Sequence, residues 1–196
     1  MNVTVMSATE RPIETISLAA GTCYGKTDVS AKRVANCYRA GHMSVFEHAY
    51  VQFRIEGVSR ACMAQLTRHR LTSFAVESQR YNRYDFTDSD DWCVIPPSIE
   101  ANPEARRLFV GGARKDALDY TALLAMGVKP EDARYKLPEA TKTNLVMTCN
   151  VRELFHIFDM RLATSAQWEI RGLAEAMRDA AANVNDQWRW LMELAS

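Results

Sequence analysis

The sequence is short of several features that would place a protein in a specialised class. Glycine (8) and proline (6) are sparse among its 196 residues, and no tract of low complexity occurs. Hydrophobic residues make up 47% of the chain, which is ordinary for a globular protein. We therefore expect little disorder and a single domain over residues 1–196.

Long apolar runs and paired cysteines are also missing. No stretch approaches the roughly 18 apolar residues of a membrane helix, and the first six residues lack the basic-then-apolar order of a signal peptide. The five cysteines are odd in number and include no C-x-x-C pair, which argues against a disulfide framework and a zinc site. We expect a soluble cytoplasmic protein with no metal and no membrane partner.

An excess of one charge is absent, and so are the common phosphate loops. Lys plus Arg (24) equals Asp plus Glu (24), which argues against binding nucleic acid mainly through its phosphates. Neither G-x-G-x-x-G nor a P-loop occurs, so a dinucleotide would not be bound at a Rossmann turn. Side chains must bind any phosphate instead.

Patterns of hydrophobicity and capping predict both strands and helices. Strict alternation from Val51 to Glu56 is typical of a half-buried strand, and Asn102 followed by Pro103 predicts the start of a long helix that ends before Gly127. The other expected strands are Val3–Met6 and Leu145–Thr148. The other expected helices are Ala31–Ala40, one capped by Ser59, one from Pro130 that carries Arg134, one capped by Asn150 with Glu153 in a capping box, and one from near Ser165 past Met177. This order without a regular βαβ repeat indicates an α+β or irregular α/β fold, with a mixed sheet flanked by long helices.

Residues 68–81 concentrate groups that bind oxyanions. Arg68, His69, Arg70 and Arg80 fall within 14 residues, close to Ser78. The arginine fork binds phosphate at two points, and hydroxyls complete the hydrogen bonds of the oxyanion. From the residues alone, a solvated basic helix end followed by a polar loop is an equal alternative.

The spacing within this segment resembles the signature of the flavin-dependent thymidylate synthases. That signature is Arg-His-Arg, seven residues, Ser, one residue and Arg-Tyr, and residues 68–81 match it throughout. Further segments are similar in the same order between Ala19 and Glu169. They are Ala20-Gly21-Thr22-Cys23-Tyr24, Gly41-His42-x-Ser44-x-x-Glu47-His48, Ala133-Arg134-x-x-Leu137-Pro138, Asn150-x-Arg152 with His156 and Arg161, and Ala166-Gln167-x-Glu169-Ile170-Arg171.

The resemblance implies a role for each matched residue. Arg161 is implied as the catalytic residue beside the pyrimidine, where a guanidinium stabilises negative charge that develops on the ring. The implied FAD-binding residues are His42, Ser44, Glu47, Arg68, His69, Arg70, Asn150, Arg152 and His156. The implied nucleotide-binding residues are Gln65, Arg68, Glu77, Ser78, Gln79, Arg80, Arg134 and Arg161. Taken singly, Asn150 is better explained as a helix cap and Glu169 as a first-turn acid, and only their joint order with the other motifs favours the site.

The implied activity is reductive methylation of dUMP at C5, a methyltransferase reaction of nucleotide biosynthesis. FAD is the implied cofactor, NADPH and methylenetetrahydrofolate are the co-substrates, and the assembly is a homotetramer with shared active sites. A chain of 196 residues has little room to enclose these molecules alone, which fits pockets at subunit interfaces. No cysteine lies where a nucleophile is needed, and Ser78 has no adjacent base, so we expect dispensable cysteines and a phosphate-binding serine.

Three departures from the family pattern keep alternatives open. Gly21 replaces an arginine, Ala75-Val76 replaces a polar pair, and Ser165 stands where several relatives have histidine. The apolar pair leaves UMP as an alternative substrate, as in relatives of nucleoside-antibiotic pathways. A remote alternative is a non-catalytic module that stacks single-stranded nucleic acid on Tyr81, Tyr84 and Phe86, although we expect no nucleic-acid partner.

Overall fold

The computed structural model describes residues 1–82, 84, 86 and 91–195. The elements in chain order are β1 (Asn2–Ala8), α1 (Pro12–Thr22), α2 (Ala31–Arg39), the 3-10 helix η1 (Met43–His48), β2 (Tyr50–Ser59), α3 (Arg60–Leu66), β3 (Thr72–Val76), α4 (Pro97–Glu100), α5 (Pro103–Ala125), α6 (Pro130–Ala133), the 3-10 helix η2 (Arg134–Lys136), β4 (Lys142–Asn150), α7 (Val151–Arg161), α8 (Trp168–Ala182) and α9 (Asp186–Leu194). The polar loop expected from Tyr81 to Asp91 lies partly outside the described residues.

The strands form one sheet in the order β1-β2-β4-β3. β1 and β2 run antiparallel with Asn2 opposite Glu56, and a register shift between Val5 and Ser7. Helices and a sheet in this order confirm the expected α+β class. The strands are antiparallel, however, where mixed directions were expected.

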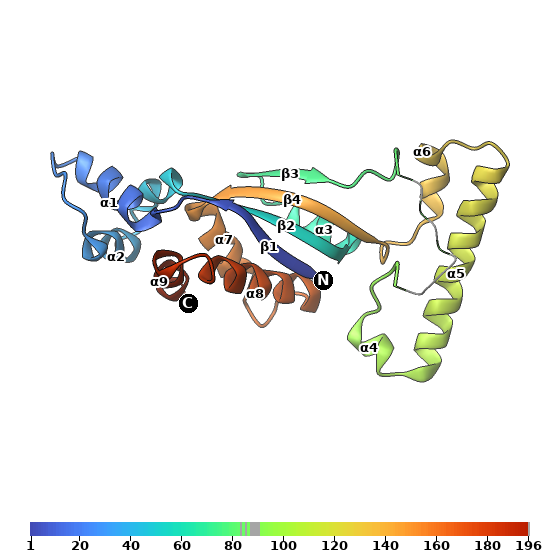
Figure 1. The fold of residues 1–196 in the computed structure, drawn as a ribbon. Helices are drawn as coiled ribbons and strands as arrows, with labels where there is room; N and C mark the ends of the chain where they lie inside the picture. Colours follow the sequence, from blue (N-terminus) through green and yellow to red (C-terminus); the bar gives the residue numbers. More distant parts are fainter. Residues whose placement is uncertain (83, 85, 87–90, 196) are drawn as a thin grey trace. The chain divides into compact units, whose positions relative to one another are not determined.

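The chain forms two compact units. The first contains residues 1–56, 65–75 and 145–196, and the second contains residues 57–64 and 76–144. In the first unit, α7, α8 and α9 lie along one face of the sheet (Figure 1). Buried Ile170, Leu173 and Met177 recur at helical spacing on α8, which contacts β1. Trp188 of α9 is fully buried, and its Nε1 donates to the Thr9 carbonyl at 2.9 Å.

The second unit is built on α5. Asn102 caps this helix by accepting from the backbone of Glu104 and Ala105, as its sequence predicts. Ala113, Ala117 and Tyr120 are its buried residues, spaced four and three apart along one face. Gly127 adopts a positive φ of 86° just beyond the helix end, which is the conformation that glycine tolerates best.

Most predicted caps and boundaries near the matched motifs are confirmed. Ser59 caps α3 by accepting from the Cys62 backbone at 2.9 Å, so Arg68 to Arg70 follow shortly after the helix. Gly41 has a φ of 72° after α2, as expected for a helix end. The sequence did not predict α1, η1, β3, α4 or α9. Within the described residues, no helix combines the length and apolar character needed to cross a membrane.

Candidate active site

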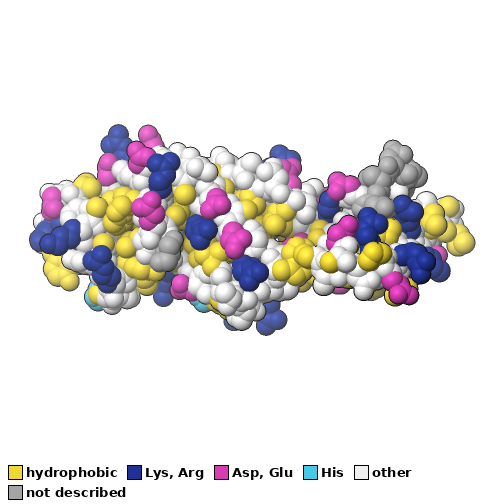
Figure 2. Space-filling model, turned by 90° about the horizontal axis from the view of Figure 1, so that it is seen from below, with side chains coloured by type: hydrophobic (Ala, Val, Ile, Leu, Met, Phe, Trp, Pro, Cys, Tyr) yellow, Lys and Arg dark blue, Asp and Glu magenta, His cyan; other side chains and the backbone are white. Residues whose placement is uncertain are grey.

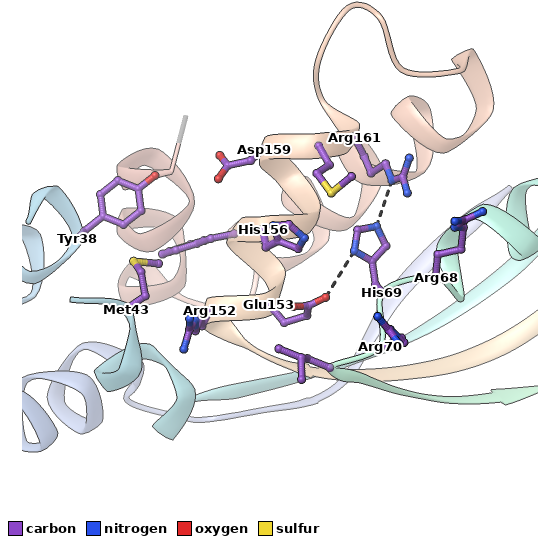
Figure 3. A pocket seen from close by; sticks show the side chains of 13 residues that line it. Tyr38, Met43, Arg68, His69, Arg70, Arg152, Glu153, His156, Asp159 and Arg161 are labelled. Atoms are coloured by element: carbon purple, nitrogen blue, oxygen red, sulfur yellow. Dashed lines mark hydrogen bonds and ion pairs between the residues drawn. The ribbon is translucent and has the colours of Figure 1, made fainter. Parts of the chain in front are cut away.

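A cavity of about 780 Å³ in the first unit collects many of the predicted residues (Figure 3). It lies between α7 and the segment that follows α3, with contributions from α2 and η1. Its lining residues are Tyr38, Met43, Arg68, His69, Arg70, Leu71, Arg152, Glu153, Phe155, His156, Asp159, Met160 and Arg161. Four of them are arginines and two are carboxylates, so positive charge is in excess.

The helix α7 presents one polar face to this cavity because of where it starts. Asn150 accepts a hydrogen bond from the Glu153 backbone at 2.9 Å and fixes the first turn. From that start, Arg152, His156 and Asp159 recur at spacings of four and three and share a face. The opposite face carries buried Leu154, Ile157 and Phe158, which anchor the helix in the core.

Three side chains form a connected series along one wall of the cavity. Arg161 Nε donates to His69 Nε2 at 3.1 Å, and His69 Nδ1 faces Glu153 Oε1 at 3.5 Å (Figure 3). An arginine nitrogen can only donate, so Nε2 of His69 accepts and the ring proton sits on Nδ1. The series therefore fixes the imidazole tautomer and restrains the Arg161 guanidinium.

His69 is held neutral by its surroundings. It is only 4% exposed, and burial, Arg161 and His156 together lower its pKa from 6.5 to about 4. Burial also raises the pKa of the Glu153 carboxyl, against the opposing influence of His156 and Arg152. At neutral pH the imidazole is thus a neutral acceptor for Arg161 and not a competing cation.

His69, Glu153 and His156 also lie close enough to suggest a metal site. Their candidate ligand atoms are within 4.8 Å of one another. The His69 ring, however, has no free lone pair, because Nε2 accepts from Arg161 and Nδ1 carries the proton. An adjacent guanidinium also opposes a cation, so we assign no metal to this cluster.

Arg68 and Arg70 are exposed and available for an anion. Within the described part of the chain, neither guanidinium has an ion pair or a side-chain hydrogen bond. Arg152 differs because it pairs with Glu47 at 2.5 Å, which joins two of the predicted FAD-binding residues. Of the four arginines in the lining, two are therefore free, Arg152 is paired with a carboxylate, and Arg161 donates to His69.

Other predicted residues lie outside the lining of this cavity. His42 and Ser44 are exposed around the start of η1, and His42 lines a separate surface hollow with Arg33. Gln65 is half-buried in the last turn of α3. Asn150 serves as the cap of α7, which is the alternative explanation that its sequence position left open.

Sequence reasoning missed several lining residues. Tyr38 packs edge-on against Phe155 with ring centroids 5.4 Å apart, and burial raises its pKa. Asp159 and Glu153 were not predicted to line a site, although their spacing from His156 on the same helix was a usable signal. Tyr38 lies on α2, far from α7 in the sequence, so its packing against Phe155 could not be predicted from residue spacing.

The remaining predicted nucleotide residues belong to the second unit. Arg80 Nε pairs with Glu131 Oε2 at 2.6 Å, and Arg134 Nε donates to the Glu131 carbonyl at 3.1 Å. Glu77 accepts from the Asn144 side chain at 2.9 Å. Ser78 Oγ accepts from the Arg80 backbone at 3.2 Å, which makes it part of the local turn. Gln79 is buried.

The departures from the signature have structural counterparts. A Cβ atom added at Gly21 would lie 2.6 Å from the Lys26 carbonyl oxygen, so a larger residue does not fit beside the loop that follows α1. Ala75 is exposed and Val76 half-buried at the end of β3. Ser165 is exposed between α7 and α8. Tyr84 stacks on Phe86, which also contacts Trp92, so these two rings are engaged within the second unit.

Comparison with known proteins places this arrangement in a family. The family model described as thymidylate synthase complementing protein matches residues 4–185. The chain belongs to that family. Curated relatives named flavin-dependent thymidylate synthase include one from Halobacterium salinarum, 38% identical over 96% of this chain and 92% of its own. Another, from Pyrococcus furiosus, is 38% identical over 95% of this chain and 81% of its own.

Solved structures of the family share the fold. The flavin-dependent thymidylate synthase ThyX of Helicobacter pylori, described as complexed with FAD and dUMP, superposes with a TM-score of 0.79 at 26% identity, covering 98% of both chains. PolB of Streptomyces cacaoi, described as a UMP/dUMP methylase bound with 5-Br dUMP, has a TM-score of 0.80 at 23% identity, covering 98% of this chain and 94% of its own. This second likeness concerns the fold alone.

Proposed function

We propose that the chain is an FAD-dependent thymidylate synthase, which methylates C5 of dUMP with methylenetetrahydrofolate and NADPH. The observation that carries the proposal is the series Arg161, His69 and Glu153 beside two free arginines in one cavity. The H. pylori relative is described with FAD and dUMP, and the curated relatives bear the corresponding name.

The cavity residues fit a flavin dinucleotide. Arg68 and Arg70 are free cations suited to its phosphates, and Tyr38, Phe155 and Met43 offer ring and apolar contacts to its ring system. We further assign His69, His156 and Arg152 to FAD, with Glu47 orienting Arg152 and Asn150 fixing the start of α7. His42 and Ser44 remain predicted flavin contacts. The flavin, when bound, supplies the hydride that completes the methyl group.

Arg161 is the proposed catalytic residue. Its guanidinium is restrained by His69 Nε2, which leaves its other nitrogens to stabilise negative charge on the pyrimidine imide. Neutral His69 carries its proton on Nδ1, where the Glu153 carboxylate favours that tautomer. A protonated His69 could not accept from Arg161, so its low pKa is part of the arrangement.

The proposed nucleotide-binding residues are divided between the two units. Gln65, Arg68 and Arg161 come from the first, and Glu77, Ser78, Gln79, Arg80 and Arg134 come from the second. We propose a homotetramer in which neighbouring subunits complete each site, with the whole of residues 1–196 acting as one functional domain. All five cysteines are free, which fits a reducing compartment such as the cytoplasm.

Single-turnover methylation of dUMP and UMP by the flavin-loaded protein tests the proposal. We expect a yellow protein that converts dUMP, and an Arg161→Lys variant that keeps its flavin spectrum but reacts about 100-fold more slowly. Arg189→Lys, at an exposed site on α9, is the matched control and should react normally. Conversion of UMP in preference to dUMP would assign the alternative substrate that Ala75-Val76 leaves open.

A different outcome would remove the enzyme proposal altogether. A colourless protein that cannot take up FAD but shifts single-stranded nucleic acid would favour a binding module. Two observations weigh against that result. Phe86 and Tyr84 are engaged with each other, and lysine and arginine lie interspersed with acidic side chains on the face shown in Figure 2.

A further inference from the structure

A second cavity, of about 330 Å³, lies within the second unit and contains a residue that no matched motif includes. Arg60, Gln79 and Arg134 line it, together with side chains of the segment that follows Arg134. Gln79 and Arg134 belong to segments that resemble the family, whereas Arg60 lies outside them as the first residue of α3. What Arg60 does there is therefore an open question.

Two buried donors in this cavity have no acceptor. Arg60 Nη1 and Gln79 Nε2 are both inaccessible to solvent and have no acceptor at hydrogen-bonding geometry within the described residues. The Tyr84 hydroxyl, which is buried and unpaired as well, is close enough to both side chains to influence them, but it is neutral and offers no anionic acceptor. Gln79 is only 6% exposed as a whole. A buried donor that is left unpaired destabilises the fold, and more so when the group is charged. Such groups call for an explanation, and a ligand that supplies acceptors is the simplest one.

The charges around the cavity favour an anion. Arg134 uses its Nε for the Glu131 carbonyl, and its terminal nitrogens have no other partner in the described part of the unit. Glu139 is an acid at the rim, yet it is exposed and forms no ion pair with Arg60 or Arg134 among the described residues. The lining thus contributes two arginines and the buried Gln79 amide, with exposed Glu139 as the acid among its residues.

We propose that Arg60 is a phosphate-binding residue, which binds the phosphate of the pyrimidine nucleotide together with Gln79 and Arg134. A phosphate oxyanion offers acceptors only, which matches the two unpaired donors and the free end of Arg134. The planar fork of arginine suits this task better than a lysine ammonium. This inference rests on the proposed nucleotide substrate, and it adds a residue outside the recognised signature.

The test compares dUMP with deoxyuridine, which lacks the phosphate. In the flavin-loaded protein, Arg60→Leu should weaken dUMP binding at least 10-fold in calorimetry and leave deoxyuridine binding unchanged. Arg106→Leu makes the same substitution at a partly exposed arginine of α5, which pairs with Glu100, and should change neither affinity. The flavin spectrum and thermal melt check that each variant is folded.

A second variant keeps the test decisive if Arg60→Leu does not fold. Arg60→Lys retains the charge and loses the fork, so it should bind dUMP more weakly than the wild type, and inorganic phosphate should compete with dUMP less effectively. Equal weakening of dUMP and deoxyuridine, or no change in either, would show that Arg60 has a structural role only. Wild-type protein that carries FAD but binds neither dUMP nor UMP would instead refute the proposed function.

Discussion

Replacement of His69 by glutamine should flatten the pH dependence of folding stability. His69 is buried between Arg161 and Glu153, and its pKa is lowered from 6.5 to about 4. The unfolded chain therefore binds a proton on this residue at a higher pH than the folded chain does. By linkage, the stability that comes from keeping His69 neutral is complete above pH 6.5 and falls as the pH drops towards 4.

The size of the effect follows from the two pKa values. Each pKa unit corresponds to about 1.36 kcal/mol, so the full loss is about 3 kcal/mol, of which about 2 kcal/mol falls between pH 7.5 and pH 5. Glutamine can still accept from Arg161 but does not titrate. Going from pH 7.5 to pH 5, the wild type should lose about 2 kcal/mol more than the His69→Gln variant.

Urea unfolding of flavin-free protein at fixed protein concentration measures this difference. Burial raises the pKa of Glu153 against the opposing influence of His156 and Arg152, and this raised pKa changes stability in the opposite direction. Glutamine at position 69 leaves these three influences in place, so their contribution is common to both proteins. His48→Gln removes an exposed histidine from the same unit and should behave as the wild type. Identical pH profiles for the wild type and His69→Gln would refute the neutral, buried state of His69.

Three further predictions concern features away from the His69 series. Gly21→Arg should destabilise the fold by roughly 1–3 kcal/mol, because its Cβ would approach the Lys26 carbonyl to 2.6 Å, and an unchanged melting temperature would show that the loop simply moves. Asn150→Ala removes the cap of α7 and should cost about 1 kcal/mol in urea unfolding, whereas Asn150→Asp should restore most of it. Replacement of all five cysteines should leave turnover largely intact, since Cys149 is buried with a pKa raised to about 12 and cannot provide a thiolate; loss of activity traced to one cysteine would contradict this.

The sequence predicted those elements that contain a local signal, either alternation of apolar and polar residues or a capping residue at a helix start. Alternation identified β2, and the caps Ser59, Asn102 and Asn150 located three helix starts that the structure confirms. β3 was missed because its five residues lie inside a motif that was interpreted chemically and not as a strand. The strand directions could not be obtained from any single strand, because they depend on pairing between distant segments.

The candidate site likewise has features that the sequence predicted and features that depend on tertiary packing. Arg68 to Arg70 and the polar face of α7 share a cavity, which the order of motifs suggested without showing their distance. The tautomer of His69 and the unpaired state of Arg60 depend on tertiary burial, which no spacing encodes. The family resemblance implied the roles of Arg161 and His69, and the hydrogen bond between them gives a chemical reason for those roles.

If Arg80 binds the nucleotide phosphate as proposed, its ion pair with Glu131 would make nucleotide binding an exchange of anions. In the free chain the Arg80 guanidinium is already neutralised by an internal carboxylate at 2.6 Å. In the proposed site an incoming phosphate would displace that carboxylate, so separation of the existing, partly exposed pair would offset part of the attraction. The same Glu131 accepts from Arg134 Nε through its backbone carbonyl, so phosphate binding at the proposed site would also act on the position of α6.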